Sequence, residues 1–224
     1  MELIKFIVNP KDKLGKDKSI YQTIYKFSLL TFLIICLGAI ALILSQTLQN
    51  FDIIPKHIKE FKPEIKSIRS SLLFSIILFP ILEEFAFRLY LKRNNINVFV
   101  SSFLITHMIC SAFIFNTNNF SLEQDGFLRI LIDSFIAFIS LYVYRKELFK
   151  LKFNFLFYFS VLLFGLVHIY NHDYSNPKVL LFALIICLPQ IIAGILFGYT
   201  RVKYGIIGSI ILHILVNGLP QLIL

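Results

Sequence analysis

The sequence is poor in charged residues and cysteine, and it contains no tryptophan. Only 16% of its 224 residues are charged, whereas 57% are hydrophobic and the mean hydropathy is +0.77. A typical soluble domain has about 25% charged residues, so this composition excludes that class and indicates a membrane protein. With no tryptophan, nine glycines and seven prolines, the composition also leaves no substrate pocket recognisable from sequence.

Three cysteines, Cys36, Cys110 and Cys187, lie within apolar stretches and show no CxxC spacing. This pattern predicts buried packing residues rather than disulfide partners, and it argues against a cysteine metal site. Internal repeats and low-complexity segments are also missing from the sequence, which argues against a repeat architecture.

Uncharged stretches long enough to cross a bilayer, which takes about 20 residues, occur at 27–51, 94–122, 179–200 and 204–224. They predict an all-α, polytopic bundle of about seven (seven to eight) transmembrane helices. The first apolar run is long and others follow it, which excludes a simple signal peptide. The expected spans are 27–49, 71–91, 97–115, 127–144, 153–170, 179–200 and 204 to the end.

The formal net charge of +9 comes from lysines and arginines that lie between the apolar segments. This placement indicates membrane orientation and not nucleic-acid binding, with the N-terminus and the basic flanks on the cytoplasmic side of a cell membrane. The basic stretch 50–70 would fall on the outside, so either it folds back as an interfacial or re-entrant element or the span count is off by one. Its near-helical charge spacing suits a segment on the membrane surface. We therefore divide the chain into an N-terminal unit, 1–70, and a helical core, 71–224.

Two adjacent carboxylates, Glu83 and Glu84, follow an uncharged run and precede Arg88. A charge in the bilayer costs about 2.5–3.5 kcal/mol on insertion scales, so such residues usually mark a site. Neighbours on a helix point about 100° apart, so we expect the two carboxylates not to share a partner. Arg88, four residues after Glu84, would neutralise it and leave Glu83 facing a cavity as a general base. A structural Arg–Glu clamp is the alternative.

Three further polar residues lie in later apolar segments. His168 ends the run Phe164–His168, where an interfacial histidine without function is the alternative. His213 and Asn217 are four residues apart and share one helix face. They could donate hydrogen bonds to a developing oxyanion or simply hold helices together.

Other polar and small residues predict helix packing. We expect His107 and Asp133 to pair as a structural contact, and Arg129 to extend to the membrane surface. The spacing Gly194–Gly198 predicts close helix packing rather than a ligand site.

The motifs Glu83-Glu84-x-x-x-Arg88, Phe164-x-x-x-His168 and His213-x-x-x-Asn217, in this order, resemble those of the CPBP family. This family is also called the Abi, or CAAX protease and bacteriocin-processing, family, and it includes the Ras-converting type of CAAX endopeptidase. The stretch 198–209 also looks typical of the last motif. The resemblance covers about residues 70–220.

The resemblance implies an intramembrane endopeptidase that cleaves a membrane-associated or exported peptide, for example in bacteriocin maturation or self-immunity. Glu83 would activate water with His168, while His213 and Asn217 would stabilise the oxyanion. Glu84 and Arg88 would support Glu83. Relatives are often described as metalloproteases, so Glu83, His168 and His213 could in principle bind zinc. The chain has no HExxH helix, and we favour a metal-free glutamate mechanism.

Two other functions compete with proteolysis. A non-catalytic immunity or scaffold protein would keep the fold and bind a peptide, and a transporter would use the carboxylates as proton carriers. The protease hypothesis also meets a problem of depth. Glu83 and His213 lie near 14 Å from basic flanks at helical rise, whereas His168 lies about 24 Å from Lys152. The fifth span must therefore start later, tilt or shift for these groups to meet.

Overall fold

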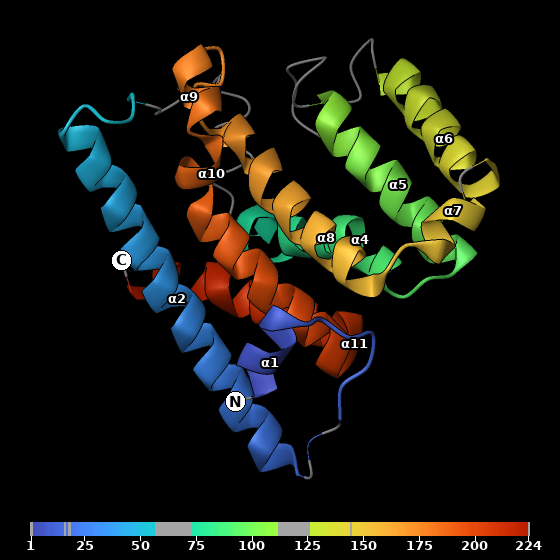
Figure 1. Cartoon of the computed structure of the whole chain (residues 1–224), viewed down its shortest axis with the longest axis horizontal. Helices are drawn as coiled ribbons and strands as arrows, with labels where there is room; N and C mark the ends of the chain where they lie inside the picture. The colour runs from blue at the N-terminus through green and yellow to red at the C-terminus, as the bar shows by residue number, and fades with distance from the viewer. Residues whose placement is uncertain are drawn as a thin grey trace.

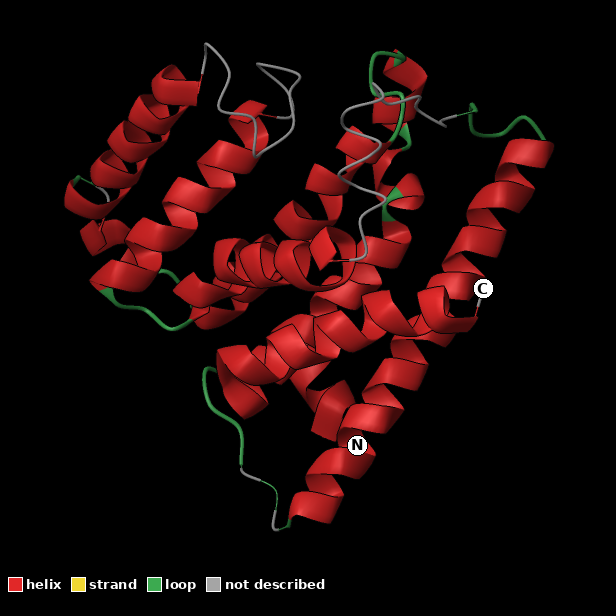
Figure 2. Ribbon diagram, turned by 180° about the vertical axis from the view of Figure 1, so that it is seen from behind, coloured by secondary structure: helices red, strands yellow, loops and turns green. Residues whose placement is uncertain are grey.

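The computed structural model describes residues 2–15, 17, 19–56, 73–111, 126–143 and 145–223. Every regular element in these ranges is a helix (Figure 2), which confirms the all-α class. Of the expected surface segment at 50–70, residues 57–70 lie outside the described residues.

The helices pack as a bundle around the short central helix α4 (Figure 1). In chain order they are α1 (Glu2–Val8), α2 (Ile20–Asn50), the π-helix η1 (Leu73–Leu78), α4 (Phe79–Arg88), the 3-10 helix η2 (Leu89–Leu91), α5 (Asn95–Ile109), α6 (Gly126–Tyr142), α7 (Arg145–Lys150), α8 (Phe153–Val167), the 3-10 helix η4 (His168–Asn171), α9 (Pro177–Leu181), α10 (Ala183–Ile186) and α11 (Leu188–Ile223).

Three helical stretches of the described chain are long and apolar enough to cross a membrane, namely Ile20–Asn50, Phe153–Asn171 and Leu188–Leu219. The shorter helix Asn95–Ile109 is also apolar. A helical membrane bundle is thus confirmed, while the count of seven to eight spans stays a prediction.

The expected division between the last two spans agrees with the structure, in which two helical arms of α11 meet at Gly205 instead of at 201–203. The first arm continues through Arg201 and Lys203, and further interruptions fall earlier, between α9, α10 and α11. The direction of α11 changes at Gly205, whose backbone angles are φ 83° and ψ −178°. That region is essentially restricted to glycine. After the bend the second arm runs back along the first, with Ser209 donating to the carbonyl oxygen of Phe197, so the end of α11 returns into the bundle (Figure 1).

Helices α8 and α11 approach closely at Gly194 and Gly198 of α11. A Cβ atom at Gly198 would lie 2.7 Å from Cε2 of Phe157, and one at Gly194 would lie 3.1 Å from Cδ1 of Phe164. The predicted close packing at these glycines is confirmed. It holds the end of α8 against the first arm of α11 in the core of the bundle.

Helices α5 and α6 pair on one side of the bundle through buried polar contacts (Figure 1). His107 Nδ1 lies 2.7 Å from Asp133 Oδ2, which confirms the expected pair. The expectation that Arg129 extends to the surface is wrong, because it is 1% exposed and donates from Nη1 to Ser111 Oγ at 3.0 Å. A buried partner replaces water as its hydrogen-bond acceptor.

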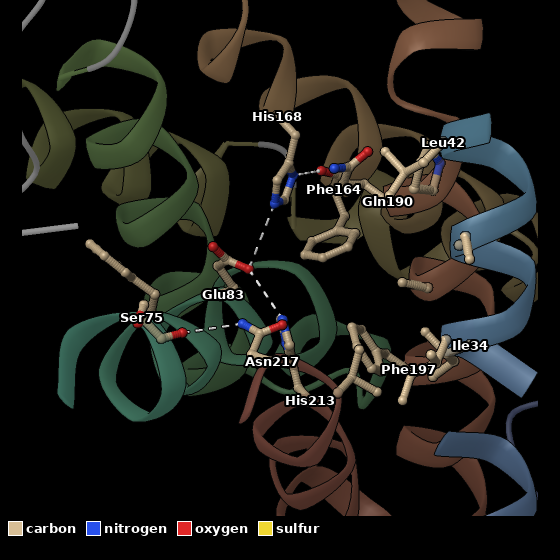
Figure 3. A pocket seen from close by; sticks show the side chains of 17 residues that line it. Ile34, Leu42, Ser75, Glu83, Phe164, His168, Gln190, Phe197, His213 and Asn217 are labelled. Atoms are coloured by element: carbon tan, nitrogen blue, oxygen red, sulfur yellow. Dashed lines mark hydrogen bonds and ion pairs between the residues drawn. The ribbon is translucent and has the colours of Figure 1, made fainter. Parts of the chain in front are cut away.

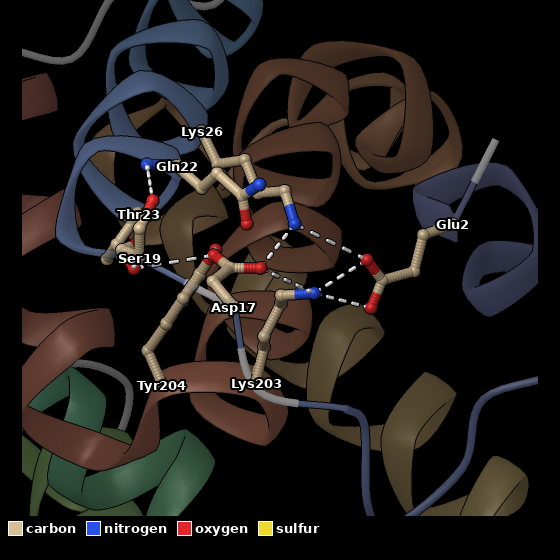
Figure 4. A network of polar contacts seen from close by, with 8 residues as sticks. All are labelled: Glu2, Asp17, Ser19, Gln22, Thr23, Lys26, Lys203 and Tyr204. Carbon is tan, nitrogen blue, oxygen red and sulfur yellow. Dashed lines mark hydrogen bonds and ion pairs between the residues drawn. The ribbon is translucent and has the colours of Figure 1, made fainter.

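The N-terminal segment is fastened to α2 and α11 by an ionic network (Figure 4). Glu2 accepts a hydrogen bond from Lys203 Nζ at 2.6 Å, and Asp17 accepts from Lys26 and from the Tyr204 hydroxyl. Burial alone would raise the pKa of the Asp17 carboxyl, but the bonds from Lys26 and Tyr204 and the charge of Lys203 lower it to about 2. These contacts neutralise Lys203 inside an apolar helix.

Candidate active site

Glu83 projects into a cavity of about 560 Å³ that is lined from α2, η1, α4, α8 and α11 (Figure 3). Its helix, α4, begins directly after the π-helix η1 and has Pro80 in its first turn. Proline suits that turn because it lacks the amide hydrogen that would otherwise find no helical partner there. The side chain of Glu83 is 16% exposed, whereas that of Glu84 is 0% exposed. The two adjacent carboxylates therefore have different surroundings, one at a cavity and one in the protein interior.

Two imidazoles from separate helices face the Glu83 carboxylate (Figure 3). Oε2 of Glu83 lies 4.0 Å from Nε2 of His168 and 3.6 Å from Nε2 of His213. These distances exceed the usual hydrogen-bond range of about 2.7–3.2 Å. Such spacing between polar atoms is compatible with a bridging water molecule.

His168 lies at the junction of α8 and η4, where the chain leaves α8. Its Nδ1 is 2.7 Å from the carbonyl oxygen of Phe164. A carbonyl oxygen only accepts, so Nδ1 carries a proton, and in the neutral form of the ring Nε2 is the bare nitrogen that faces Glu83. The expected difference in depth does not keep the groups apart, because α8 crosses α4 obliquely (Figure 1).

His213 contacts both carboxylates of the Glu pair, so the expectation that they do not share a partner is wrong. Its Nε2 faces Glu83 at 3.6 Å, while its Nδ1 lies 3.0 Å from Oε1 of Glu84. The helical angle of about 100° separates the two side chains, but the two ring nitrogens lie on different edges of the imidazole. One ring therefore bridges both carboxylates, and Glu84 fixes the proton on Nδ1.

Glu84 and Arg88 form a fully buried pair beneath the cavity, as the sequence predicts. Arg88 Nε lies 3.8 Å from Glu84 Oε2, and both side chains are 0% exposed. The guanidinium carbon of Arg88 is 3.9 Å from the centre of the Phe164 ring, a cation–π contact. Ser209 also donates a hydrogen bond to Glu84. Glu84 thus contacts Arg88, Ser209 and His213 but does not itself line the cavity.

Asn217 lines the same cavity as His213, four residues further along α11. Its amide Nδ2 donates to the carbonyl oxygen of Ser75 at 3.2 Å (Figure 3). Ser75 belongs to the π-helix η1, an element that often marks functional sites. An amide has two N–H donors, so the contact with η1 orients Asn217 and leaves a second donor.

Several residues of the site escaped the sequence reasoning. Ser209 lies four residues before His213, so the stripe that contains His213 and Asn217 could have indicated it. Phe197 stacks on His213 with ring centres 4.2 Å apart. Helix α2 lines the cavity with Ile34, Gly38 and other apolar residues that carry no sequence signal for a site. The division at residue 70 stays a prediction, although α2 contributes to the same cavity as Glu83.

The predicted zinc ligands can be compared with the geometry that zinc requires. Donors bound to tetrahedral zinc at about 2.1 Å lie about 3.4 Å from one another. The Glu83 oxygen is farther than this from both His168 and His213, and among the described residues no three His, Cys, Asp or Glu side chains are arranged to hold a metal ion. The three side chains are therefore not preformed as a zinc site in this arrangement, and zinc binding stays a prediction.

A comparison with protein families finds one match. The family described as Rce1-like, type II CAAX prenyl endopeptidase, matches residues 66–219, well over half of the chain. This range contains the six candidate site residues, namely Glu83, Glu84, Arg88, His168, His213 and Asn217. No curated protein and no solved structure matches the chain.

Proposed function

The chain belongs to the Rce1-like family of type II CAAX prenyl endopeptidases, and from this premise we propose that it is an intramembrane endopeptidase with Glu83 as the general base. The observation that carries the proposal is the approach of two imidazole Nε2 atoms, from separate helices, to within 4.0 Å of one Glu83 oxygen. A water molecule bound among these atoms would donate to the carboxylate and to the bare Nε2 of His168. Its lone pair would then point toward the substrate.

In the proposed reaction, Glu83 removes a proton while the water oxygen bonds to the carbonyl carbon of the scissile peptide. Negative charge develops on the carbonyl oxygen. His213, whose ring Glu84 holds in place, and the free N–H of Asn217 would stabilise it. Glu83 then gives its proton to the amine nitrogen as the C–N bond breaks. The carboxylate returns to its starting state and no further reactant is required.

The position of the cavity supports a membrane-borne substrate. Helix α2 lines it with Ile34, Ile35, Gly38 and Leu42, and other α2 residues, such as Phe32 and Ile43, are exposed on the surface of the bundle. An apolar group attached to a peptide could bind against this wall while the peptide reaches Glu83. We propose a prenylated or otherwise membrane-anchored peptide in the cell membrane as the substrate. A role in bacteriocin maturation or self-immunity stays a prediction.

The test replaces Glu83 by Gln, which keeps the shape of the side chain and removes the base. A fluorogenic prenylated CAAX peptide in liposomes reports cleavage by the reconstituted protein. We expect the rate to fall by about 10²–10⁴-fold, the usual contribution of a general base, while Glu147→Gln on the exposed face of α7 retains activity. Undiminished cleavage by Glu83→Gln would reject the mechanism. Absence of cleavage by the unsubstituted protein, with peptide binding retained in Glu83→Gln, would favour a non-catalytic scaffold.

A further inference from the structure

A second cavity, of about 450 Å³, lies away from Glu83 and is bounded by segments that are distant in sequence. It is lined by the segment after α1, by the residues that follow η2, by the start of α8 and by the bend of α11 at Gly205. Three of these segments contribute cationic side chains, namely Lys13, Lys92, Arg93 and Arg201. One carboxylate, Asp12, also lines the cavity.

The four cavity cations differ from nearby lysines in their ionic partners. Lys26 and Lys203 both have carboxylate partners, supplied by Glu2 and Asp17 (Figure 4). In contrast, no carboxylate of the described chain lies within 4.0 Å of the nitrogens of the four cavity cations. Asp12 offsets one of four positive charges, so the cavity keeps a net charge of about +3.

Two of the cations are held in place by backbone contacts. Arg93 donates from Nη1 to the carbonyl oxygen of Phe149 at 2.9 Å, and Arg201 donates from Nε to the carbonyl oxygen of Arg88 at 3.1 Å. Both guanidinium groups therefore retain further N–H donors in a fixed position. Fixed arginines beside flexible lysines suit the oxygens of a phosphate group, which arginine binds through paired N–H groups.

We propose that this cavity binds a phosphate group, with the headgroup of an anionic phospholipid as its source in the membrane. The cavity lies at the end of the bundle where the basic flanks of several helices gather, which the positive-inside rule assigns to the cytoplasmic face. Anionic lipids are enriched in that leaflet, and basic pockets between helices bind their headgroups. The inference does not depend on peptidase activity, because the Glu83 carboxylate lines the other cavity.

The test measures ligand binding to the purified full-length protein in neutral detergent by calorimetry. The probes are a short-chain phosphatidylglycerol, the matched phosphatidylcholine and inorganic phosphate. Lys13→Gln with Lys92→Gln removes two cavity charges and spares the two arginines that contact backbone. Lys5→Gln with Lys146→Gln is the control, since it removes two charges from exposed lysines outside the cavity.

We expect phosphatidylglycerol to bind more tightly than phosphatidylcholine. The cavity variant should weaken this binding by about 25-fold, or about fivefold for each lysine, while the control changes it by less than about twofold. Binding of inorganic phosphate with the same variant dependence, but not of phosphatidylglycerol, would support the phosphate site and assign it to a soluble ligand. Equal losses in the two variants, or no binding of either anionic probe, would overturn the proposal.

Discussion

Replacing Glu84 by Gln should destabilise the protein far more than an ordinary charge removal. The substitution leaves the Arg88 guanidinium buried without its counter-charge, 3.8 Å from the position of the lost carboxylate. At that distance, with an effective dielectric constant of about 20, the lost attraction is about 4 kcal/mol. This value agrees with the 3–5 kcal/mol that is typical when one partner of a buried ion pair is removed.

Replacing the other member of the pair, Arg88, should have a smaller effect on stability. Arg88→Met leaves Glu84 with its hydrogen bonds from Ser209 and His213, so the carboxylate is still compensated. The main loss is the contact of the guanidinium with the Phe164 ring. In the double variant neither charge remains, so we expect a loss of stability smaller than the sum of the two single losses by about 1–3 kcal/mol.

Unfolding by sodium dodecyl sulfate in mixed micelles provides the measurement for purified single and double variants. Glu147→Gln is the matched control, since its ion pair with Lys150 is 69–70% exposed and such pairs contribute about 0–1 kcal/mol. An unchanged midpoint for Glu84→Gln, or strictly additive losses, would refute the inference that Arg88 depends on Glu84 for its burial.

Three further outcomes follow from the fold and the cavity. Gly205→Ala should lower stability by about 1–3 kcal/mol, because its backbone conformation is essentially restricted to glycine; unfolding midpoints equal to the parent would contradict this. The ionic network at Asp17 should persist above pH about 4 and be lost as the pH falls toward its lowered pKa of about 2. Limited proteolysis of the N-terminal segment across that range should show its release, and Asp17→Asn should abolish the pH dependence. Gly38→Leu should leave stability nearly unchanged, since a Cβ there meets no atom within 4 Å, but it should slow cleavage of peptides with bulky lipid anchors relative to small ones.

The convergence of Glu83, His168 and His213 could be anticipated from sequence because each is a costly polar residue in an apolar helix. The same reasoning gave the Glu84–Arg88 contact from their four-residue spacing. It did not predict that both carboxylates share His213, because an argument from helix angles assumes that each partner offers one contact atom. The imidazole of His213 offers two nitrogens, and one faces each carboxylate.

The path of the last helix was less predictable for a different reason. The charged residues Arg201 and Lys203 placed the boundary between the last two spans at 201–203, because uncompensated charge is expensive in lipid. The break falls slightly later, at Gly205, since Glu2 and Asp17 near the N-terminus neutralise Lys203 within the first arm. Likewise the contribution of α2 to the cavity depends on packing, since its apolar residues at Ile34 and Gly38 resemble those of any membrane helix.

Glu83 and Glu84 face the two different nitrogens of the His213 ring, so the geometry of the site depends on the rotation of α4 about its own axis. Inserting a single residue ahead of the pair would rotate both acids by about 100°. Glu84 would then lose Ser209 and His213 of α11 while Glu83 left the water position, and only Arg88, on the same helix, would rotate with them. An insertion or deletion upstream of Glu83 must therefore be accommodated before α4 begins. The π-helix η1, which is wider than an α-helix, can accommodate an extra residue there.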